Sequence, residues 1–398
     1  MPEMQILPKE ELNRRIASLQ TQLAEKGTDG ALIMHSTDLV YFTGVFQNSF
    51  LYIPVEGEPL FMVRRSMERA TALTPLSKVI PVKSIKQVPG IIKENGYEQM
   101  ETLGVEMDVL PASMFFNLQK LFPGVNLVDC SAIIKKQRAV KSSLEIEQIQ
   151  HVSDMMDKVF ASVPEFLRPG MTEVELAGQL EARLRKEGHQ GLVRVRGFNQ
   201  DFHYGCLLSG PNGGVPSFFD GPLGGPGIYA AFPFGTGDRV IEKNEPVLID
   251  YVGVKNGYSV DMTRLYVIGD LDDKLSAAHK TALDIQQAVV DAARPGALGS
   301  DIYEKAYGIA CDSGLEEWFM GCIDQVSFIA HGVGLELNEL PVLARGLKMQ
   351  LEEGMVIALE PKFVFPGEGA VGIENTFVVT AEGLKRFSSY PDEVVNIK

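Results

Sequence analysis

The sequence has few cysteines, and none of them is placed for metal binding or for a disulfide framework. The four cysteines, at positions 130, 206, 311 and 322, are far apart in the 398 residues, and no CxxC pair occurs. This spacing argues against a structural zinc site and against a fold that depends on disulfides. We therefore expect reduced, buried thiols and a cytoplasmic protein.

The sequence also lacks a long apolar run and an excess of basic residues. No apolar stretch approaches the roughly 18 residues that a membrane-spanning helix needs. The opening residues, MPEMQILPKEELNRRIASL, are charged and have no apolar core, so we expect no signal peptide. With 37 Lys and Arg against 52 Asp and Glu, the net charge is −15, which would repel a phosphate backbone. We therefore expect neither membranes nor nucleic acids as partners.

The length and the order of the patterns predict two domains. A chain of 398 residues exceeds the size of one ordinary hydrophobic core. Residues 1–138 alternate a helical pattern, KEELNRRIASLQTQLAEKG, with β patterns such as DGALIMHS and SKVIPVK, which indicates a small α/β domain. A helix-start signal in KSSLEIEQIQ then places the boundary near residues 135–145. Residues 145–398 form the second predicted domain.

The second domain contains a weak internal repeat. The segment RPGMTEVELAGQLEARLRKEG, from Arg168 to Gly188, resembles RPGALGSDIYEKAYGIACDSG, from Arg294 to Gly314. Further along each half, EKNEPVLID resembles EEGMVIALE, and both segments end on a carboxylate. Chance explains one such match, but two in the same order favour an α+β domain of two halves related by a pseudo-two-fold axis. A site between these halves would receive carboxylates from both.

Four carboxylates interrupt apolar strand patterns in this domain, namely Asp250, Asp261, Glu360 and Glu374. The two aspartates lie on β patterns joined by the turn signal KNG, so facing strands would bring them to the same end of a hairpin. A charged side chain inside an apolar strand is costly unless it is paired or bound to a metal. Each carboxylate alone is most simply a solvent-exposed strand end, whereas the four together favour a cation site.

A histidine, His331, stands in the glycine-rich segment AHGVGLELNE between the two carboxylate pairs. Taken alone, it is a metal ligand, a general base or a core residue. With the four carboxylates it completes a hard, oxygen-rich set that suits two divalent ions such as Mn²⁺, Co²⁺, Fe²⁺ or Zn²⁺. Without cations, the clustered carboxylates would repel one another and their pKa values would rise.

These segments resemble a known family. IDYVGVKNGYSVDMTR, AHGVGLELNE, IALEP and VGIENTFVVT are similar, in this order, to the metal-site motifs of the Xaa-Pro peptidase and methionine aminopeptidase family, M24. In the first domain, DLVYFTGVF resembles the creatinase-type N-terminal domain. The resemblance implies a pita-bread catalytic domain, α+β with pseudo-two-fold symmetry, together with a smaller α/β N-terminal domain. It also implies a homodimer.

The resemblance further implies roles for individual residues. Asp250, Asp261, His331, Glu360 and Glu374 stand at the positions of the five metal ligands, and in this family two metals hold a bridging water. Glu360 is the implied base that takes a proton from this water. The implied reaction is hydrolysis of a C–N amide bond in a dipeptide or another small Xaa-Pro-type substrate.

The sequence departs from the peptidase pattern at three positions. Ser217 and Asn338 stand where peptidase members carry histidines that attend the substrate, and Gly372 stands where members often carry arginine. Serine and asparagine can donate a hydrogen bond, so both are retained as substrate-binding candidates, although neither carries a proton near pH 7 as an imidazolium does. His203, in NQDFHYGC, is either an exposed loop residue or a catalytic replacement for a missing histidine.

Residues 209–238 predict the rim of a pocket. Nine of these 30 residues are Gly and five are Pro, and the segment is rich in aromatic side chains, among them the substrate-binding candidate Phe218. Long irregular segments inside a domain are functional lids or disordered linkers, and so many aromatic residues argue against disorder. An aromatic-walled pocket suits a small or apolar substrate.

Three functions fit these patterns. The first is a metal-dependent dipeptidase, which the complete ligand set supports. The second is a non-peptidase hydrolase or lyase of a small metabolite on the same scaffold, which Ser217 and Asn338 favour. The third is a non-catalytic metal-binding protein, which is the least favoured because all five ligand positions are retained.

Overall fold

The computed structural model describes residues 7–398, which form two compact units. The first unit is Met1–Arg138 together with Arg196–Asn199, and the second is Ala139–Val195 with Gln200–Lys398. Residues 1–6 lie outside the described residues. They are the start of the first predicted domain, and they also belong to the charged opening segment for which we expect no signal peptide. The return of Arg196–Asn199 to the first unit is a feature that no sequence pattern predicted.

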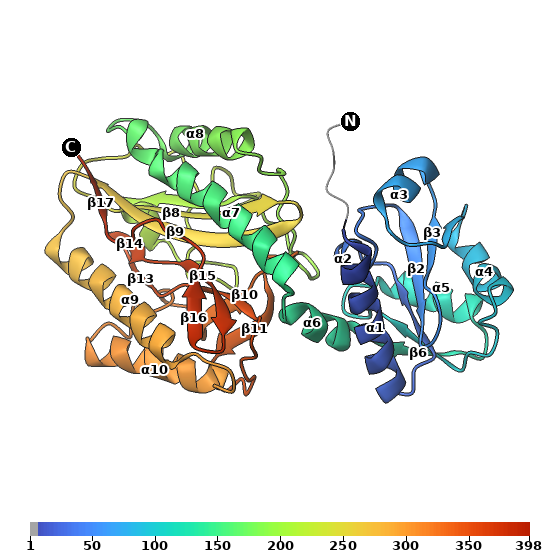
Figure 1. Cartoon of the computed structure of the whole chain (residues 1–398). Coiled ribbons are helices and arrows are strands. Elements are labelled where there is room, and N and C mark those ends of the chain that lie inside the picture. Colours follow the sequence, from blue (N-terminus) through green and yellow to red (C-terminus); the bar gives the residue numbers. More distant parts are fainter. Residues whose placement is uncertain (1–6) are drawn as a thin grey trace. The chain divides into compact units, whose positions relative to one another are not determined.

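The first unit is a mixed sheet with helices packed against it (Figure 1). Its strand order is β4-β3-β2-β1-β5-β6, in which β2 is antiparallel to both neighbours and the other pairs are parallel. Helix α1 turns an apolar stripe with Leu12, Ile16, Leu19 and Leu23 inward, which confirms the predicted helix. The elements are α1 (Lys9–Glu25), β1 (Gly30–Ile33), α2 (Ser36–Thr43), β2 (Ser49–Pro54), β3 (Leu60–Val63), α3 (Met67–Leu73), β4 (Val79–Pro81), η1 (Ile85–Gln87), α4 (Val88–Glu94), β5 (Thr102–Val105), α5 (Ala112–Leu121), β6 (Asn126–Asp129) and α6 (Ser131–Ala139).

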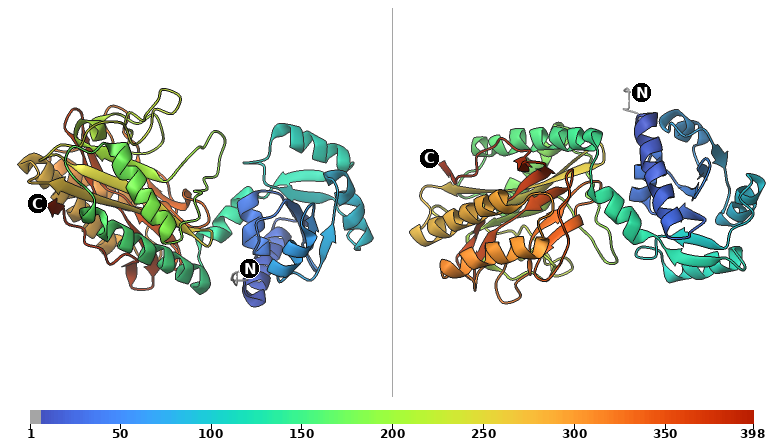
Figure 2. Two further views of the ribbon diagram at one scale, coloured as in Figure 1. Left: turned by 90° about the horizontal axis from the view of Figure 1, so that it is seen from above. Right: turned by 60° about the horizontal axis from the view of Figure 1, so that its bottom comes forward.

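The second unit encloses two sheets between two pairs of helices. One sheet has the order β17-β9-β8-β7 and the other β11-β10-β12-β15-β16, while β13 and β14 form a separate hairpin. Helices α7 and α8 cover one outer side, and α9 and α10 cover the opposite side (Figures 1 and 2). The elements are α7 (Ser143–Ala161), η2 (Val163–Glu165), α8 (Glu173–Lys186), β7 (Gly205–Ser209), η3 (Gly210–Gly214), β8 (Val247–Lys255), β9 (Tyr258–Ile268), α9 (Asp273–Ala292), α10 (Gly299–Asp312), β10 (Phe328–Gly332), β11 (Glu339–Ala344), β12 (Val356–Leu359), β13 (Lys362–Phe365), β14 (Gly369–Gly372), β15 (Asn375–Thr380), β16 (Gly383–Arg386) and β17 (Val395–Ile397).

Helix α7 begins where the sequence predicted a helix start. The Ser142 side chain accepts a hydrogen bond from the backbone N–H of Glu145, and the Glu145 side chain accepts one from the backbone N–H of Ser142. This reciprocal arrangement is a capping box, which satisfies two backbone donors that the first helical turn leaves free. None of the helices in residues 7–398 combines the length and apolar character that crossing a bilayer requires.

The two halves of the second unit share equivalent backbone contacts. The N–H of Gly170 donates to the carbonyl of Ile241, just as the N–H of Gly296 donates to the carbonyl of Leu351. Isolated β-bridges pair the residues before α8 and α10, Thr172 and Leu298, with residues upstream of β8 and β12. Each half therefore anchors a helix next to the strand that leads to a carboxylate predicted to bind metal. The α+β architecture with two related halves confirms what the repeat predicted.

Candidate metal centre

The first pair of predicted ligands lies on two facing strands. β8 and β9 are antiparallel, with Asp250 opposite Thr263 and Val252 opposite Asp261. Because side chains alternate along a strand, this offset of two residues places both aspartates on the same face of the sheet. The side chain of Asp261 is buried, and that of Asp250 is 17% exposed.

The second pair comes from the other sheet. Glu360 directly follows β12 and Glu374 directly precedes β15, and these strands are antiparallel with Leu359 opposite Asn375. Glu374 also forms a β-bridge with Thr263, through backbone hydrogen bonds of 3.3 and 3.4 Å in the two directions. This bridge links the two sheets and brings the glutamates of one half to the aspartates of the other.

His331 faces three of these carboxylates. Its Nε2 atom lies 3.8 Å from Asp261 Oδ2, 3.6 Å from Glu360 Oε1 and 3.8 Å from Glu374 Oε1. Its Nδ1 atom lies 3.2 Å from the carbonyl oxygen of Gly332. An Nδ1–H that donates to this carbonyl leaves the lone pair of Nε2 directed at the carboxylates, which is the orientation of a metal-binding histidine.

The carboxylates lie in an environment that disfavours their charged form. Burial raises the pKa of Asp261 well above its usual value, and the nearby charges of Glu374 and Asp250 raise it further. Burial also raises the pKa values of Asp250 and Glu374, although the charge of Lys362 opposes both shifts. Among residues 7–398, no group donates a hydrogen bond to Glu374 Oε1. Such a cluster is costly unless cations neutralise it.

One residue of this site, Lys362, was not predicted from the sequence. Its ammonium group lies 2.7 Å from Glu360 Oε2, 2.7 Å from Glu374 Oε2 and 3.0 Å from Asp250 Oδ2, and the side chain is 1% exposed. Burial alone would lower the pKa of Lys362, but the three carboxylates raise it well above its usual value. A signal was present in the sequence, because Lys362, two residues after Glu360, interrupts an otherwise apolar run.

A cavity opens above these residues. Its polar floor contains the two aspartates, the two glutamates and His331. Asn338 also lines it, and its side chain makes no hydrogen bond with another residue of the described part of the chain. The apolar wall consists mainly of Phe202, Phe219, Leu223, Phe234, Phe328 and Leu337. This combination of apolar walls and a few convergent polar groups is typical of a small-molecule site.

The remaining candidates do not line this cavity. The Ser217 hydroxyl donates to the carbonyl of Phe219 at 3.0 Å and accepts from its N–H at 3.1 Å, so the side chain closes a local turn. Ser217 and Phe218 border a neighbouring hollow beside residues 324–328, and Phe218 is 64% exposed. His203 is exposed, and its ring lies 6.0 Å from that of Phe232. Of the aromatic residues in the predicted rim, Phe219 and Phe234 line the cavity, whereas the candidate Phe218 does not.

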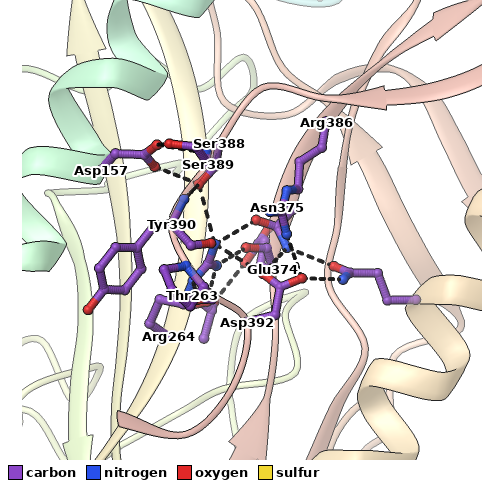
Figure 3. A network of polar contacts seen from close by, with 12 residues as sticks. Asp157, Thr263, Arg264, Glu374, Asn375, Arg386, Ser388, Ser389, Tyr390 and Asp392 are labelled. Atoms are coloured by element: carbon purple, nitrogen blue, oxygen red, sulfur yellow. Dashed lines mark hydrogen bonds and ion pairs between the residues drawn. The ribbon is translucent and has the colours of Figure 1, made fainter.

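A buried arginine holds the junction between the two sheets. Arg264 donates from Nη1 to the carbonyls of Thr263 at 2.8 Å and Glu374 at 2.9 Å, and from Nη2 to Asn375 Oδ1 at 2.8 Å. It also forms an ion pair of 3.2 Å with Asp392 (Figure 3). The side chain is fully buried, and burial lowers its pKa to about 10. Arg264 thus fixes the backbone from which Glu374 extends.

Glu173 accepts hydrogen bonds from both ends of the glycine-rich segment 209–238. This fully buried carboxylate accepts hydrogen bonds from the backbone N–H and the hydroxyl of Ser209, from the amide of Asn212 and from the N–H of Gly237. Because four donors meet one charged acceptor, the segment is held in a defined path despite its composition. The predicted pocket rim is therefore anchored at the start of α8.

Two known protein families match this chain. Residues 147–381 match metallopeptidase family M24, and residues 15–140 match the creatinase/prolidase N-terminal domain. The first match spans more than half of the chain. The chain belongs to metallopeptidase family M24. This assignment confirms the resemblance in the sequence, including the pita-bread fold of the catalytic domain and the creatinase-like N-terminal domain.

Several M24 relatives are similar over most of their length. A probable dipeptidase PepE from Mycobacterium tuberculosis strain H37Rv is 27% identical over 343 residues, which cover 83% of this chain and 82% of the relative. An Xaa-Pro dipeptidase from Pyrococcus furiosus is 27% identical and covers 83% of this chain and 84% of its own. The solved structure of an Xaa-Pro dipeptidase from Bacillus anthracis superposes with a TM-score of 0.83 at 24% identity, over 97% of this chain and all of that chain.

M24 peptidases use divalent metal ions, and the described residues fit one such ion. Ligands bound to one ion at about 2.0–2.2 Å are separated from one another by roughly 3–4 Å. The distances from His331 Nε2 to its three carboxylate oxygens, 3.6–3.8 Å, match this requirement. Asp261, His331 and Glu374 each offer an atom to a cluster in which all atoms lie within 4.8 Å. A second ion does not fit in the same way, because it would compete with Lys362 for Asp250, Glu360 and Glu374.

Proposed function

We propose that this protein hydrolyses a C–N amide bond in a small Xaa-Pro-type substrate, with Xaa-Pro dipeptides as the first candidates. One observation carries the proposal: His331 Nε2 faces three carboxylate oxygens at 3.6–3.8 Å on the floor of an apolar cavity. The names of the M24 relatives support the substrate class, because they include dipeptidases and Xaa-Pro dipeptidases.

The individual roles follow from the positions of the side chains. A divalent ion bound in such a site supplies a water of lowered pKa and polarises a carbonyl group. Glu360 lies on the cavity floor and is the proposed base that accepts the proton of the attacking water. Asn338 is the proposed donor to the substrate carbonyl, since its amide lines the cavity and is not engaged elsewhere in the described chain. The aromatic wall would hold a proline ring and exclude bulk water.

The number and identity of the ions are part of the proposal. The family implies two ions, with Mn²⁺, Co²⁺, Fe²⁺ and Zn²⁺ as the candidates for a site rich in oxygen ligands. The distances support one ion directly, in the group formed by Asp261, His331 and Glu374.

A second candidate function is a non-peptidase hydrolase or lyase that acts on a small metabolite. Two observations favour it. Asn338 lines the cavity at a position where peptidase members carry histidine, and the Ser217 hydroxyl is engaged in a local turn outside the cavity. Neither position then supplies an imidazolium to stabilise developing charge at the substrate.

The two functions are separated by an activity panel. The full chain is loaded with Mn²⁺ or Co²⁺ and assayed on Xaa-Pro dipeptides, Xaa-Pro tripeptides and a set of small amides, with Asp261→Asn as the metal-site control. Turnover of a dipeptide by the wild type and loss of turnover in Asp261→Asn support the dipeptidase. Absence of peptide turnover, with turnover of a metabolite amide that depends on Asp261, supports the second function and refutes the first.

The assembly and location of the protein are separate proposals. We propose a homodimer, because the family resemblance implies one. We also propose a cytoplasmic location, because the sparse, unpaired cysteines favour it. Light scattering of the purified chain measures the mass of the assembly, and a monomer at micromolar concentration would contradict the dimer.

A further inference from the structure

Lys362 occupies the space enclosed by three of the five predicted ligands. A lysine ammonium has three N–H donors, and here the three nearest acceptors are Asp250 Oδ2, Glu360 Oε2 and Glu374 Oε2, at 2.7–3.0 Å. The side chain is fully enclosed, so water cannot replace these contacts. The carboxylates thus surround a positive charge supplied by the chain itself.

The backbone opposite Lys362 leaves space for this side chain. Lys362 pairs with Gly372 across the β13–β14 hairpin. A Cβ atom on residue 372 would lie 2.7 Å from the Cα of Lys362, 2.8 Å from its Cγ and 2.5 Å from the carbonyl oxygen of Pro361. These distances are too short for van der Waals contact, so the absence of a side chain at 372 allows the lysine stem to pass. Lys362 and Gly372 therefore form a structural pair.

The oxygens of the two glutamates divide between two positions. Glu360 and Glu374 each direct Oε2 at Lys362 and Oε1 toward His331. Glu374 Oε1 is buried and receives no hydrogen bond from the described residues. Asp261 Oδ2 completes the group around His331. Two positions for positive charge thus lie side by side, and Lys362 fills the one that also borders Asp250.

We propose that the Lys362 ammonium acts as a built-in cation in place of one divalent ion, so that this chain binds a single ion between Asp261, His331, Glu360 and Glu374. Asp250 then serves as a partner of Lys362 and not as a metal ligand. A second ion would require Asp250 and the two glutamate Oε2 atoms, and it would displace a buried ammonium group from the three carboxylates that hold it. The inference rests on the metal centre of the proposed function but not on the identity of the substrate.

Metal counting tests this proposal without an activity assay. The full chain is freed of metal with EDTA, dialysed against Mn²⁺, and its bound manganese is measured by mass spectrometry and electron paramagnetic resonance. We expect one ion per chain with the signal of isolated Mn²⁺ in the wild type. We expect two ions with an exchange-coupled signal in Lys362→Met, in which the three carboxylates have lost their cation. Lys141→Met is the matched control, since Lys141 is equally buried and lies 3.2 Å from a carboxylate outside the centre.

A second pair of variants keeps Lys362 in place and covers the case in which Lys362→Met does not fold. Asp261→Asn is expected to abolish Mn²⁺ binding. Asp250→Asn is expected to retain one ion, with an affinity loss within the about 10–100-fold range of residues that only support a metal site. Equal loss of binding in both variants would overturn the proposal.

The outcomes distinguish this inference from the proposed function. Two coupled ions in the wild type would overturn the inference and leave the hydrolase standing. One ion without turnover of any amide would support the inference and refute the hydrolase. A wild-type chain that binds no Mn²⁺, Co²⁺, Fe²⁺ or Zn²⁺ would overturn both.

Discussion

Lys362 and Gly372 lie directly opposite each other in the β13–β14 hairpin, and the lysine stem passes through the space that a side chain at 372 would occupy. This pairing places an ammonium group among carboxylates that the family pattern assigns to metals. It also links two positions that are separated in sequence, so a change at either one is expected to affect the other.

The first prediction concerns this pairing. Gly372→Ala adds a Cβ atom 2.7 Å from the Cα of Lys362 and 2.5 Å from the carbonyl oxygen of Pro361. We expect a loss of about 1–3 kcal/mol in the free energy of unfolding, which is typical of overpacking in a filled core. Urea denaturation measures this loss.

The control for this prediction is Gly308→Ala in helix α10, where an added Cβ meets nothing within 4 Å. It should stabilise the protein by about 0.5–1 kcal/mol, because alanine is the better helix former. If Gly372→Ala were as stable as wild type, the close packing around Lys362 would be refuted.

The second prediction concerns Asn338. If its amide donates to the substrate carbonyl, Asn338→Ala should lower kcat by about 10²–10³-fold while the bound metal is unchanged. Asn338→Gln retains the amide and should recover part of the loss. The measurement is steady-state kinetics on the best substrate of the panel, with metal content determined on the same samples. A kcat of Asn338→Ala within twofold of the wild type would remove this residue from the proposed site.

The third prediction concerns the junction of the two sheets. Arg264→Met removes the donors to the carbonyls of Thr263 and Glu374 and breaks the ion pair of Arg264 with Asp392, which keeps its contact with Arg386. Breaking such a buried pair should cost about 3–5 kcal/mol in the free energy of unfolding.

Arg386→Met is the control for the Arg264 variant. Arg386 contacts the same aspartate from a side chain that is 32% exposed, so its loss should cost less than about 1 kcal/mol. Chemical denaturation of the two variants gives the comparison. Equal losses would show that Arg264 has no special role at the junction.

The fourth prediction concerns pH and the first unit. Glu106 is fully buried; its Oε2 atom accepts hydrogen bonds from the backbone N–H groups of Met34 at 2.7 Å and His35 at 3.0 Å. Burial raises the pKa of Glu106 well above its usual value, and the charge of Asp38 adds to this shift. A carboxyl group whose pKa is higher in the folded state loses its contribution to stability as the pH rises above its unfolded pKa of about 4.3.

Glu106→Gln should therefore gain stability over the wild type as the pH is raised from 5 to 8. The free energy of unfolding from urea titrations at several pH values tests this, with the exposed Glu101→Gln as the control. A difference between variant and wild type that is constant with pH would contradict the assignment.

Much of the candidate metal centre could be predicted because charged residues in apolar strand patterns are unusual. Asp250, Asp261, Glu360 and Glu374 stood out for this reason, and His331 stood out for its glycine-rich surroundings. The internal repeat predicted two related halves, which the equivalent hydrogen bonds of Gly170 and Gly296 confirm. These features are local, since the alternation of side chains along a strand and the residues of a turn can be recognised within short segments.

The loop residues were harder to place. Ser217, Phe218 and His203 were candidates for the pocket, but Ser217 closes a turn with Phe219, and the other two are exposed. The direction of a side chain in an irregular segment depends on distant anchors such as Glu173, which binds both ends of this one. No local pattern contains that information.

The sequence by itself indicated the family through the resemblance of its motifs. It also predicted the two-halved α+β domain and the five residues that converge on the centre, because an internal repeat and charged residues in apolar strand patterns are visible in it. Only the tertiary structure decided which atoms meet there. Lys362 begins β13 two residues after Glu360, and its distances to Asp250 and Glu374 depend on how β8, β12 and β15 come together and on the space beside Gly372. The balance of charge in the centre, one ammonium group among four carboxylates, is a property of that packing.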